Sequence, residues 1–329
     1  MAKKVSVVVP IYKVEQFIGR CVKSLLEQTL CEVEYIFVDD ASPDRSIEIL
    51  QDVIAQYPNR QPDIKLITHK QNQGLPAARN TGLAVASGEY IFNCDSDDYM
   101  ELDMLESLYN KAKKCDADVV WCDFFLSFEK SERYMRQPEY AIPIDAVKAM
   151  LSGRMKFNVW NKLVRRSLYE DNSIAFPSGY GMGEDMTMIL LTSCARKIAY
   201  LPRAFYHYIK LNTGAFSQTY SPRHLIEVRS NVERVVEYIR SKYGEALDPE
   251  LSFLKLDVKF PFLISDDWEK YKRWSEWYPE ANEYILKNKS ISFRSRMVQW
   301  LAWKRQFWAV WLYYKIVFRF IYGVIYRYL

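Results

Sequence analysis

Apolar and polar residues alternate in blocks over the first 125 residues, and the blocks predict strands and helices in turn. The apolar run at 5–10 is typical of a strand buried on both faces. Between 14 and 26 the apolar residues recur every three or four positions, as in an amphipathic helix. Further strands are predicted at 34–39, 64–68, 90–94 and 119–122, with helices between them. This pattern favours an α/β fold with a mostly parallel sheet flanked by helices, which binds its ligands beyond the carboxyl ends of the strands.

The pattern becomes more helical after residue 140 or so. Helices are predicted at 144–151, 167–171, 185–194 and 222–243, and short strands at 198–201 and 205–209. Gly179, Gly181 and Gly183 predict a flexible approach to the helix at 185. We therefore expect a sheet-containing domain over 1–220, a helical region over 221–286 and a basic, aromatic C-terminal tail over 287–329.

Composition indicates the cellular compartment of the protein and the kind of metal site to expect. No signal peptide pattern precedes the first strand, so we expect a cytoplasmic protein whose cysteines are reduced. The six cysteines form no C-x-x-C pair and there are only three histidines, which disfavours a zinc site.

Two acidic clusters follow predicted strands, Asp39-Asp40 and Asp95-Ser96-Asp97-Asp98. Either cluster alone could be a solvated polar loop. The D-x-D spacing places Asp95 and Asp97 on the same side of an extended segment. Two carboxylates so placed suit a hard divalent cation such as Mg²⁺ or Mn²⁺ that also binds phosphate oxygens.

Four motifs occur in order along the chain: Val5-Ser6-Val7-Val8-Val9-Pro10-Ile11-Tyr12, Phe37-Val38-Asp39-Asp40-Ala41-Ser42, Asn72-x-Gly74-x-x-x-Ala78-Arg79-Asn80-x-Gly82 and Gly88-Glu89-Tyr90-x-x-x-x-Asp95-Ser96-Asp97-Asp98. Together they resemble the family 2 inverting glycosyltransferases of GT-A fold, of the capsular or surface polysaccharide type. The resemblance covers roughly residues 4–210 and implies a GT-A domain over 1–220 that binds a nucleotide-sugar donor.

The resemblance implies roles for matching residues. Asp39 would bind the edge of the base, Asp95 the ribose, and Asp97 would be the principal metal ligand, with Asp95 beside it. Asp40 could instead be a turn or helix-cap residue, and Arg79 could contact the diphosphate or hold Asp95 in place. The remaining expected donor contacts are Pro10, Tyr12, Glu15, Asn72, Gly74 and Ser96.

An inverting transfer needs a carboxylate base opposite the leaving group. Glu184-Asp185 resembles the acidic pair of the family, and we expect Asp185 to be the base, with Glu184 as the second candidate. Both carboxylates could instead merely favour a helix N-terminus. Trp160-Asn161-Lys162 resembles a segment that precedes this pair in capsule-type members and suggests an acceptor-side role.

His207 lies between two tyrosines, in Tyr206-His207-Tyr208. The resemblance makes it a candidate third metal ligand, because some GT-A enzymes use a late histidine. A histidine among aromatic residues is more often a satisfied structural residue.

The implied reaction is the inverting transfer of one sugar from a nucleotide-sugar, with a UDP-sugar favoured, to a glycan or lipid-linked acceptor. The processive relatives carry Q-x-x-R-W, whereas Gln299-Trp300-Leu301-Ala302-Trp303 lacks the arginine, which favours single addition.

One alternative is a non-catalytic protein that binds sugar nucleotides or glycans on the same scaffold. A sugar-1-phosphate nucleotidyltransferase is disfavoured, because no glycine-rich loop follows the first strand.

The C-terminal tail differs in charge from the rest of the chain. From Lys287 onward there are nine basic residues and no acidic ones, against 36 basic and 41 acidic residues before it. If 294–329 were helical, one apolar stripe would run beside a basic arc, as in a helix lying on an anionic membrane. Packing of the stripe on protein is the alternative, and no nucleic-acid module is recognised. The stripe comprises Trp300, Trp303, Phe307, Trp311, Tyr314, Phe318, Ile321 and Ile325, and the arc Arg294, Lys304, Arg305, Lys315, Arg319 and Arg327.

Overall fold

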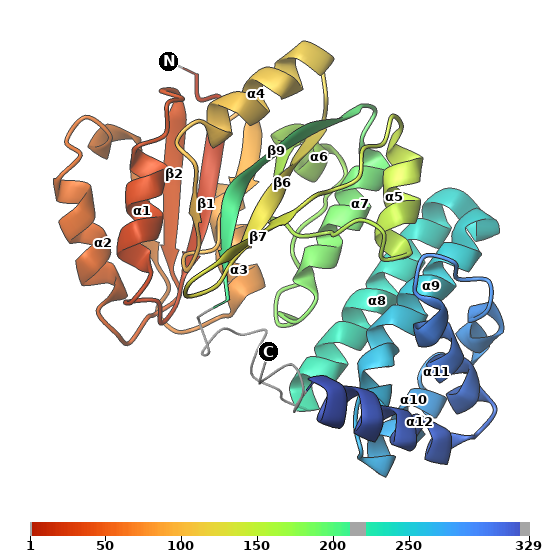
Figure 1. The fold of residues 1–329 in the computed structure, drawn as a ribbon. Coiled ribbons are helices and arrows are strands. Elements are labelled where there is room, and N and C mark those ends of the chain that lie inside the picture. Colours follow the sequence, from red (N-terminus) through yellow and green to blue (C-terminus); the bar gives the residue numbers. More distant parts are fainter. Residues whose placement is uncertain (1, 211–221, 323–329) are drawn as a thin grey trace. The chain divides into compact units, whose positions relative to one another are not determined.

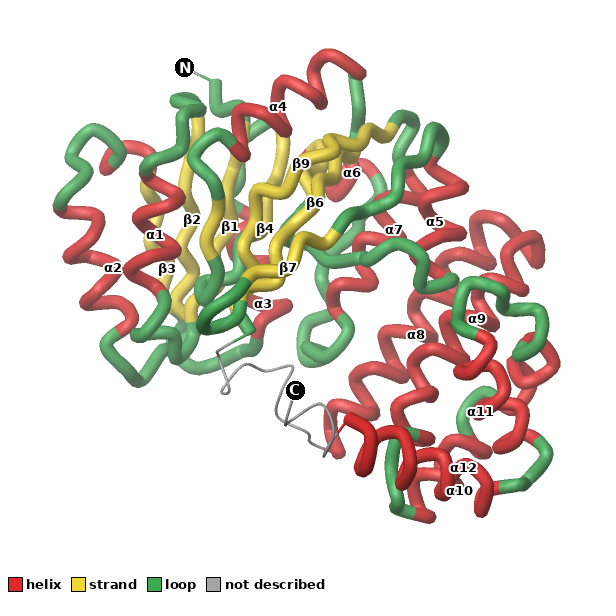
Figure 2. Tube along the Cα trace, in the orientation of Figure 1, coloured by secondary structure: helices red, strands yellow, loops and turns green. Residues whose placement is uncertain are grey.

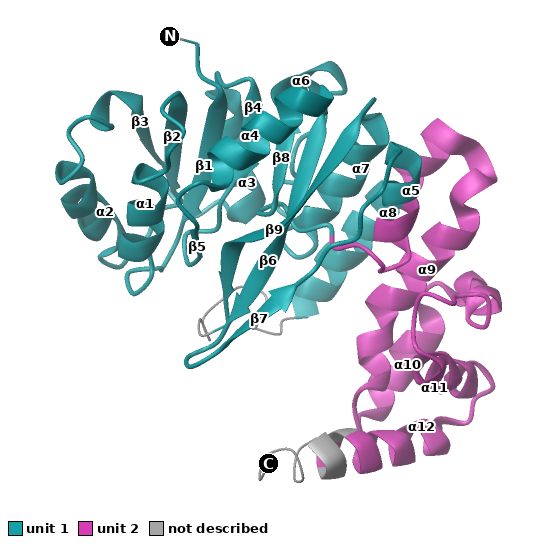
Figure 3. Cartoon of the chain, turned by 45° about the horizontal axis from the view of Figure 1, so that its top comes forward, with its two compact units in different colours: residues 1–147, 157–235 teal, residues 148–156, 236–329 magenta. Residues whose placement is uncertain are grey.

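The computed structural model describes residues 2–210 and 222–322 (Figure 1). They form two compact units, one of residues 1–147 and 157–235, the other of residues 148–156 and 236–329 (Figure 3). All the strands belong to the first unit, and the described part of the second is helical (Figure 2). The expected boundaries at 220 and 286 remain predictions.

One nine-stranded sheet forms the centre of the first unit. Its order is β3-β2-β1-β4-β8-β6-β9-β5, with β7 paired to β6. The strands β1 to β4 run parallel, as predicted, and β8 pairs antiparallel with both β4 and β6. The strands are β1 (Val5–Ile11), β2 (Val33–Asp39), β3 (Ile64–Thr68), β4 (Tyr90–Asn93), β5 (Tyr99–Met100), β6 (Val119–Ser127), β7 (Glu132–Met135), β8 (Lys162–Arg165) and β9 (Ile198–Ile209).

Helices cover both faces of the sheet, as predicted for an α/β fold. In Figure 1, α1 and α4 lie on the near face and α3 on the far face. The N–H of Leu105 at the start of α4 donates to Gln28 just after α1, which joins the two near-side helices (3.0 Å). The helices of this unit are α1 (Ile18–Leu26), α2 (Ser46–Ala55), α3 (Leu75–Ala84), α4 (Met104–Cys115), α6 (Arg166–Asp171), α7 (Thr187–Cys194) and, up to residue 235, α8 (Pro222–Tyr243). α5 (Pro143–Leu151) spans a boundary between the units.

Close packing of α3 on the sheet depends on a glycine of the third motif. A Cβ atom on Gly82 would lie 2.4 Å from Cγ1 of Val8 in β1. Since real atoms do not approach so closely, any larger residue would push α3 off the strand. Gly82 therefore fixes how near the rest of α3, including Arg79, lies to the ends of the strands.

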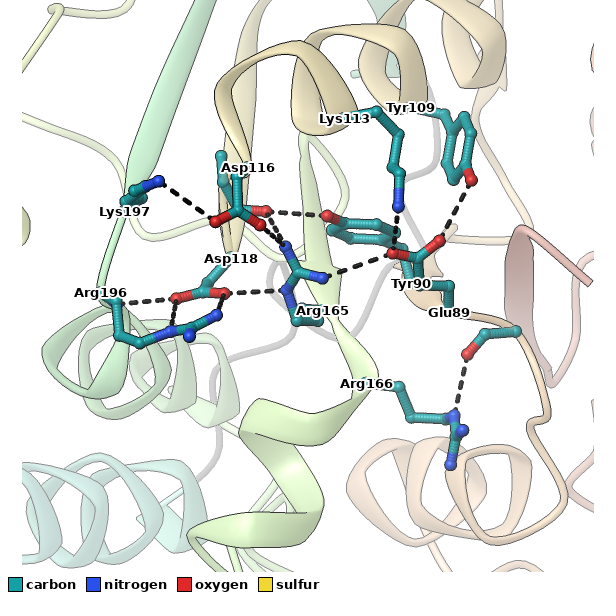
Figure 4. A network of polar contacts seen from close by, with 12 residues as sticks. Glu89, Tyr90, Tyr109, Lys113, Asp116, Asp118, Arg165, Arg166, Arg196 and Lys197 are labelled. Carbon is teal, nitrogen blue, oxygen red and sulfur yellow. Dashed lines mark hydrogen bonds and ion pairs between the residues drawn. The ribbon is translucent and has the colours of Figure 1, made fainter.

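An ion-pair network joins strands that are distant in sequence at the edge of the sheet where β4 and β6 begin (Figure 4). The buried carboxylate of Asp118 binds Arg165 at the end of β8 (2.8 Å) and Arg196 before β9 (3.2 Å). Arg165 also reaches Glu89 and Asp116. The two arginines neutralise this buried carboxylate, and the backbone N–H of Arg196 also donates to it (2.8 Å).

The second unit contains a buried lysine, Lys259. The ammonium of Lys259 donates to the carbonyls of Trp277 and Tyr278 and to Asn282, and lies 4.3 Å from the centre of the Trp274 ring. Burial lowers the pKa of Lys259 to about 7, against an opposing effect of Glu280. The helices of this unit are the part of α8 after residue 235, α9 (Asp248–Lys259), α10 (Trp268–Glu276), α11 (Phe293–Trp303), α12 (Phe307–Tyr313) and a π-helix (Tyr314–Tyr322).

The tail is not one continuous helix. Arg305 adopts a left-handed conformation (φ 61°) between α11 and α12, so the stripe and arc drawn on a single helix are broken there. Phe307 stacks on Tyr271 of α10 (5.7 Å between ring centres), so this part of the stripe packs on protein. Ile325 and Arg327 lie outside the described residues. In the segments 2–210 and 222–322, no helix is both long and apolar enough to cross a membrane.

We predict that Asp118→Ala lowers the free energy of unfolding by about 2–4 kcal/mol, because two arginines lose their buried partner. Asp116→Ala is the matched control. Asp116 binds the same Arg165 but is 60 % exposed, and its removal should cost less than about 1 kcal/mol. Urea unfolding of both variants tests this, and equal losses would contradict the assigned importance of Asp118.

Candidate active site

The acidic clusters meet at one edge of the sheet. Ile11 at the end of β1 pairs with Asp39 of β2, and Val8 of β1 pairs with Asn93 of β4. The carboxyl ends of these parallel strands therefore lie side by side, and the segments with Asp39 and Asp95 leave the sheet together. This is the edge at which a doubly wound sheet binds its ligands.

Asp40 organises the loop that leads into α3. Its buried carboxylate accepts from His69 (2.7 Å) and from the backbone N–H groups of Gln73 and Gly74 (both 2.8 Å). Of the alternatives for Asp40, these contacts favour a structural, loop-holding residue. The loop presents Asn72, whose side chain is exposed, and turns into α3 at Gly74 with φ of 89°.

The other residues expected around the donor lie near the same strand ends. Asp39 is buried and accepts from the N–H of Ser42 (2.8 Å). Tyr12 is 41 % exposed just beyond β1, after the buried Pro10. Glu15 is exposed and accepts from the N–H of Arg45 just before α2 (3.1 Å).

Arg79 joins the D-x-D segment to the Glu184-Asp185 pair. Its guanidinium is 1 % exposed and donates to Asp95 (2.7 Å) and Glu184 (2.8 Å), with Asp185 3.6 Å away. Burial alone would lower the pKa of Arg79, but the three carboxylates raise it above its usual value. Of the two roles considered for Arg79, these contacts match the one that holds Asp95 in place.

Both members of the acidic pair bind protons more tightly than usual. Burial raises the pKa of Asp185 to about 6, with Asp95 also raising it and Arg79 and Lys162 opposing. Burial and then Asp185 raise the pKa of Glu184, against the effect of Arg79. A carboxylate with a pKa near neutrality both accepts a proton at physiological pH and can return it, as a general base must.

The D-x-D residues fit a divalent cation that also binds substrate. Asp95 and Asp97 are both half-buried, whereas Ser96 between them is buried. Within the described parts of the chain, no group of three or more acidic, histidine or cysteine side chains is arranged to hold a metal. Two carboxylates completed by phosphate oxygens are a usual way of binding Mg²⁺, so Asp97 and Asp95 fit the ion expected from the sequence.

Both ring nitrogens of His207 are occupied by carboxylates in this structure. One ring nitrogen contacts Glu132 (2.7 Å) and the other Glu101 (2.9 Å). One of these bonds would have to break before His207 could bind a metal, so the third-ligand role remains a prediction. Its neighbour Tyr206 contacts the D-x-D segment instead, by accepting from the N–H of Asp95 (3.1 Å).

The glycine-rich loop is held by a polar stripe on α8 that the sequence analysis missed. Asn231 donates to the carbonyls of Tyr180 and Met182 (both 3.0 Å), and Glu227 accepts from the N–H of Met182 (3.0 Å). Arg234 binds Ala175 and Thr187 on either side of the acidic pair, and Arg223 binds Gly179. The spacing of residues 223, 227, 231 and 234 on one helical face was the available signal.

We predict that Asn231→Asp loosens this loop, because an acceptor would replace the amide that donates to two carbonyls. Hydrogen exchange at 176–183 should accelerate, and the free energy of unfolding should fall by about 1–3 kcal/mol. Arg229→Ala is the control on the same helix, since its pair with Glu233 is exposed. Unchanged exchange in Asn231→Asp would show that α8 does not hold the loop.

Comparison with known proteins agrees with this arrangement. A family model described as glycosyl transferase family 2 matches residues 6–185, more than half of the chain. The chain is 36% identical over 195 residues to EpsJ of Bacillus subtilis, an uncharacterised glycosyltransferase. The match covers 56% of this chain and about half of EpsJ, 54%. It is 29% identical over 313 residues to the glycosyltransferase GlyG of Streptococcus pneumoniae, covering 90% of this chain and 96% of GlyG.

A solved structure shares the fold. The crystal structure of S. aureus TarS 1–349 in complex with UDP-GlcNAc superposes with a TM-score of 0.69 at 22% identity, covering 95% of this chain and 91% of that one. At this identity the likeness establishes the fold. The chain thus belongs to glycosyl transferase family 2 and has the GT-A fold.

Proposed function

We propose that this chain transfers a single sugar, with inversion, from a nucleotide-sugar to a hydroxyl of a glycan or lipid-linked acceptor in surface polysaccharide synthesis. The observation that carries the proposal is the ion-pair cluster around Arg79. It brings the D-x-D segment and the Glu184-Asp185 pair, which are 89 residues apart, to one site. A site for donor and base must contain both.

A UDP-sugar is the favoured donor. TarS, whose fold this chain shares, was solved with UDP and with UDP-GlcNAc. In this chain Tyr12, Asp39 and the loop held by Asp40 supply an aromatic ring, a carboxylate and a backbone turn at the strand ends. A carboxylate suits the N–H edge of uracil, or of thymine in a dTDP-sugar.

In the proposed reaction the acceptor oxygen attacks the anomeric carbon, and the bond to the diphosphate oxygen breaks. Asp185 accepts the proton of the attacking hydroxyl. Asp97, with Asp95, would hold Mg²⁺ or Mn²⁺, which would stabilise the negative charge of the departing diphosphate. Arg79 keeps Asp95 and Glu184 in place and leaves Asp185 the more exposed of the pair, at 29 % against 10 %.

We predict that the protein hydrolyses one donor from a panel of UDP-, dTDP- and GDP-sugars with Mn²⁺ or Mg²⁺. Asp97→Ala should lose metal-dependent donor binding and turnover, because it removes the main ligand. Asp185→Asn should still bind the donor but lose at least about a hundredfold in rate, as expected when a general base is removed. Isothermal titration and release of the nucleotide diphosphate measure the two effects.

Asp103→Ala is the control for these two substitutions. Asp103 is an acidic residue directly before α4, and it pairs with Arg203 near the surface. Donor binding without turnover in the wild type would favour a non-catalytic sugar-nucleotide binding protein. No binding of any donor, with or without metal, would exclude the transferase proposal.

We also propose that the tail contacts an anionic membrane, through a face that differs from the predicted stripe. Trp308, Leu312 and Ile316 follow at four-residue steps and are 63, 43 and 48 % exposed, and Trp311 beside them is 37 % exposed. Exposed cationic side chains precede and follow these residues along the chain, at Lys304, Arg305 and Arg319. Apolar groups beside basic ones suit the interface of an anionic bilayer, where each cation adds about 1 kcal/mol.

The protein should sediment with vesicles that contain phosphatidylserine and should remain in the supernatant with purely zwitterionic vesicles. The double substitution Trp308→Ser and Leu312→Ser should abolish sedimentation, because it removes the apolar anchor. Ile226→Ser, at an equally exposed apolar position of α8 (66 %), should leave it unchanged. Sedimentation that survives the double substitution would rule out this face.

A further inference from the structure

The two carboxylates of the D-x-D motif lie in one tight turn between β4 and β5. The N–H of Asp98 donates to the carbonyl of Asp95 (3.2 Å), which closes a four-residue turn with Ser96 and Asp97 at its central positions. Asp97 is the proposed principal ligand of the metal. Its position therefore depends on how the two ends of the turn, Asp95 and Asp98, are held.

Asp98 is a buried acidic residue that the proposed reaction does not use. It is 1 % exposed, and its Oδ1 accepts from the backbone N–H of Ile209 in β9 (2.8 Å). β5 pairs with β9 no further than His207, so Ile209 lies beyond the residues that β5 reaches. The carboxylate of Asp98 thus takes the place of a strand partner. Since a buried N–H without an acceptor is costly, this bond fixes the second end of the turn on β9.

The first end of the turn is held by the same strand. The N–H of Asp95 donates to the phenolic oxygen of Tyr206 (3.1 Å), three residues before Ile209 in β9. Tyr206 is fully buried, and its ring stacks on Trp160 with ring centres 4.7 Å apart, which fixes the place of its hydroxyl. Arg79 on α3 binds the carboxylate of Asp95 (2.7 Å). The backbone of the turn is therefore bound to β9 at both ends.

We propose that Asp98 and Tyr206 are positioning residues for Asp97: they hold the two ends of its turn on β9, so that the Asp97 carboxylate is offered to a divalent cation in a fixed position. Mg²⁺ in particular demands near-ideal ligand geometry. Contacts that orient a metal ligand from outside the coordination shell change metal affinity by about 10- to 100-fold. The inference rests on the proposed role of Asp97 as a metal ligand.

The sheet contains a second pair of the same kind, Asp123 and Tyr200, which provides matched controls. Asp123 is also 1 % exposed and accepts from a backbone N–H, that of Gln137 (2.6 Å). Tyr200 is a buried tyrosine of β9 whose hydroxyl donates to Asp123 (2.7 Å). These contacts join β6 and β9 to the segment after β7 and involve no residue of the turn 95–98. Substitutions in this pair should disturb the sheet without moving Asp97.

The experiment measures Mn²⁺ binding in the presence of saturating UDP, by isothermal titration. Asp98→Ala should weaken Mn²⁺ binding by at least about tenfold, because one end of the turn is released. Tyr206→Phe should weaken it by a smaller factor, since Asp98 and Arg79 still hold the turn. Asp123→Ala and Tyr200→Phe should bind Mn²⁺ as the wild type does, although Asp123→Ala should lower the thermal midpoint about as much as Asp98→Ala.

Asp98→Asn tests whether the hydrogen bond is what matters. The amide keeps an oxygen that can accept from the N–H of Ile209, so this variant should retain most of the Mn²⁺ affinity that Asp98→Ala loses. Asp98→Asn binding Mn²⁺ as weakly as Asp98→Ala would overturn the proposed action through Ile209. Tyr206→Phe keeps the buried ring and carries the test if Asp98→Ala does not fold.

Hydrogen exchange gives a second readout that requires neither metal nor turnover. Asp98→Ala should accelerate exchange at 95–98 and at Ile209, and Tyr206→Phe at 95–98, whereas both controls should leave these amides unchanged. Equal Mn²⁺ affinity in the wild type, Asp98→Ala and Tyr206→Phe would overturn this inference and leave the proposed function standing. A wild type that binds no Mn²⁺ with UDP would instead overturn the proposed metal site itself, and the inference with it.

Discussion

The site depends on the burial of one guanidinium among three carboxylates. Arg79 is almost fully buried, and a charge in that position is tolerated only if nearby carboxylates neutralise it. Asp95 and Glu184 accept from its two terminal nitrogens, and Asp185 lies just beyond hydrogen-bonding distance. The donor side and the base side of the proposed reaction are thereby held by the same cation. Movement of either carboxylate would leave Arg79 partly unpaired, so the cluster favours one geometry.

Other parts of the fold serve to bring Arg79 and its partners to that point. Gly82 allows α3 to lie against Val8, which sets the depth of Arg79. Asn231 and Glu227 of α8 in turn bind the backbone of the loop that leads to Glu184. Parallel strands supply the rigid support, and Asp95 and Asp97 lie on the loop beyond β4, where changes in sequence can alter the chemistry without changing the sheet.

The parallel strands and most of the helices were predictable, because long apolar runs and helical periodicity report burial directly. The helix at Pro222–Tyr243 and the strand at Ile64–Thr68 agree with the expected bounds. Strand β8 was missed because it has only four residues, Lys162–Arg165, and begins and ends with a cation. The burial of Lys162, which donates to the turn just before the strand, could not be read from the sequence. The contacts of α8 were missed for a related reason. A polar stripe looks solvated until the backbone that it binds is known.

Charge balance at the strand ends bears on how a donor could bind there. Asp95, Glu184 and Asp185 gather around the buried cation Arg79, and Asp97 lies on the same loop as Asp95. A diphosphate adds further negative charge, and like charges at close range in a buried site repel strongly. A divalent cation on Asp97 would relieve this excess while Asp185 stays ionised to act as the base, so the proposed metal and the proposed base belong to one electrostatic arrangement.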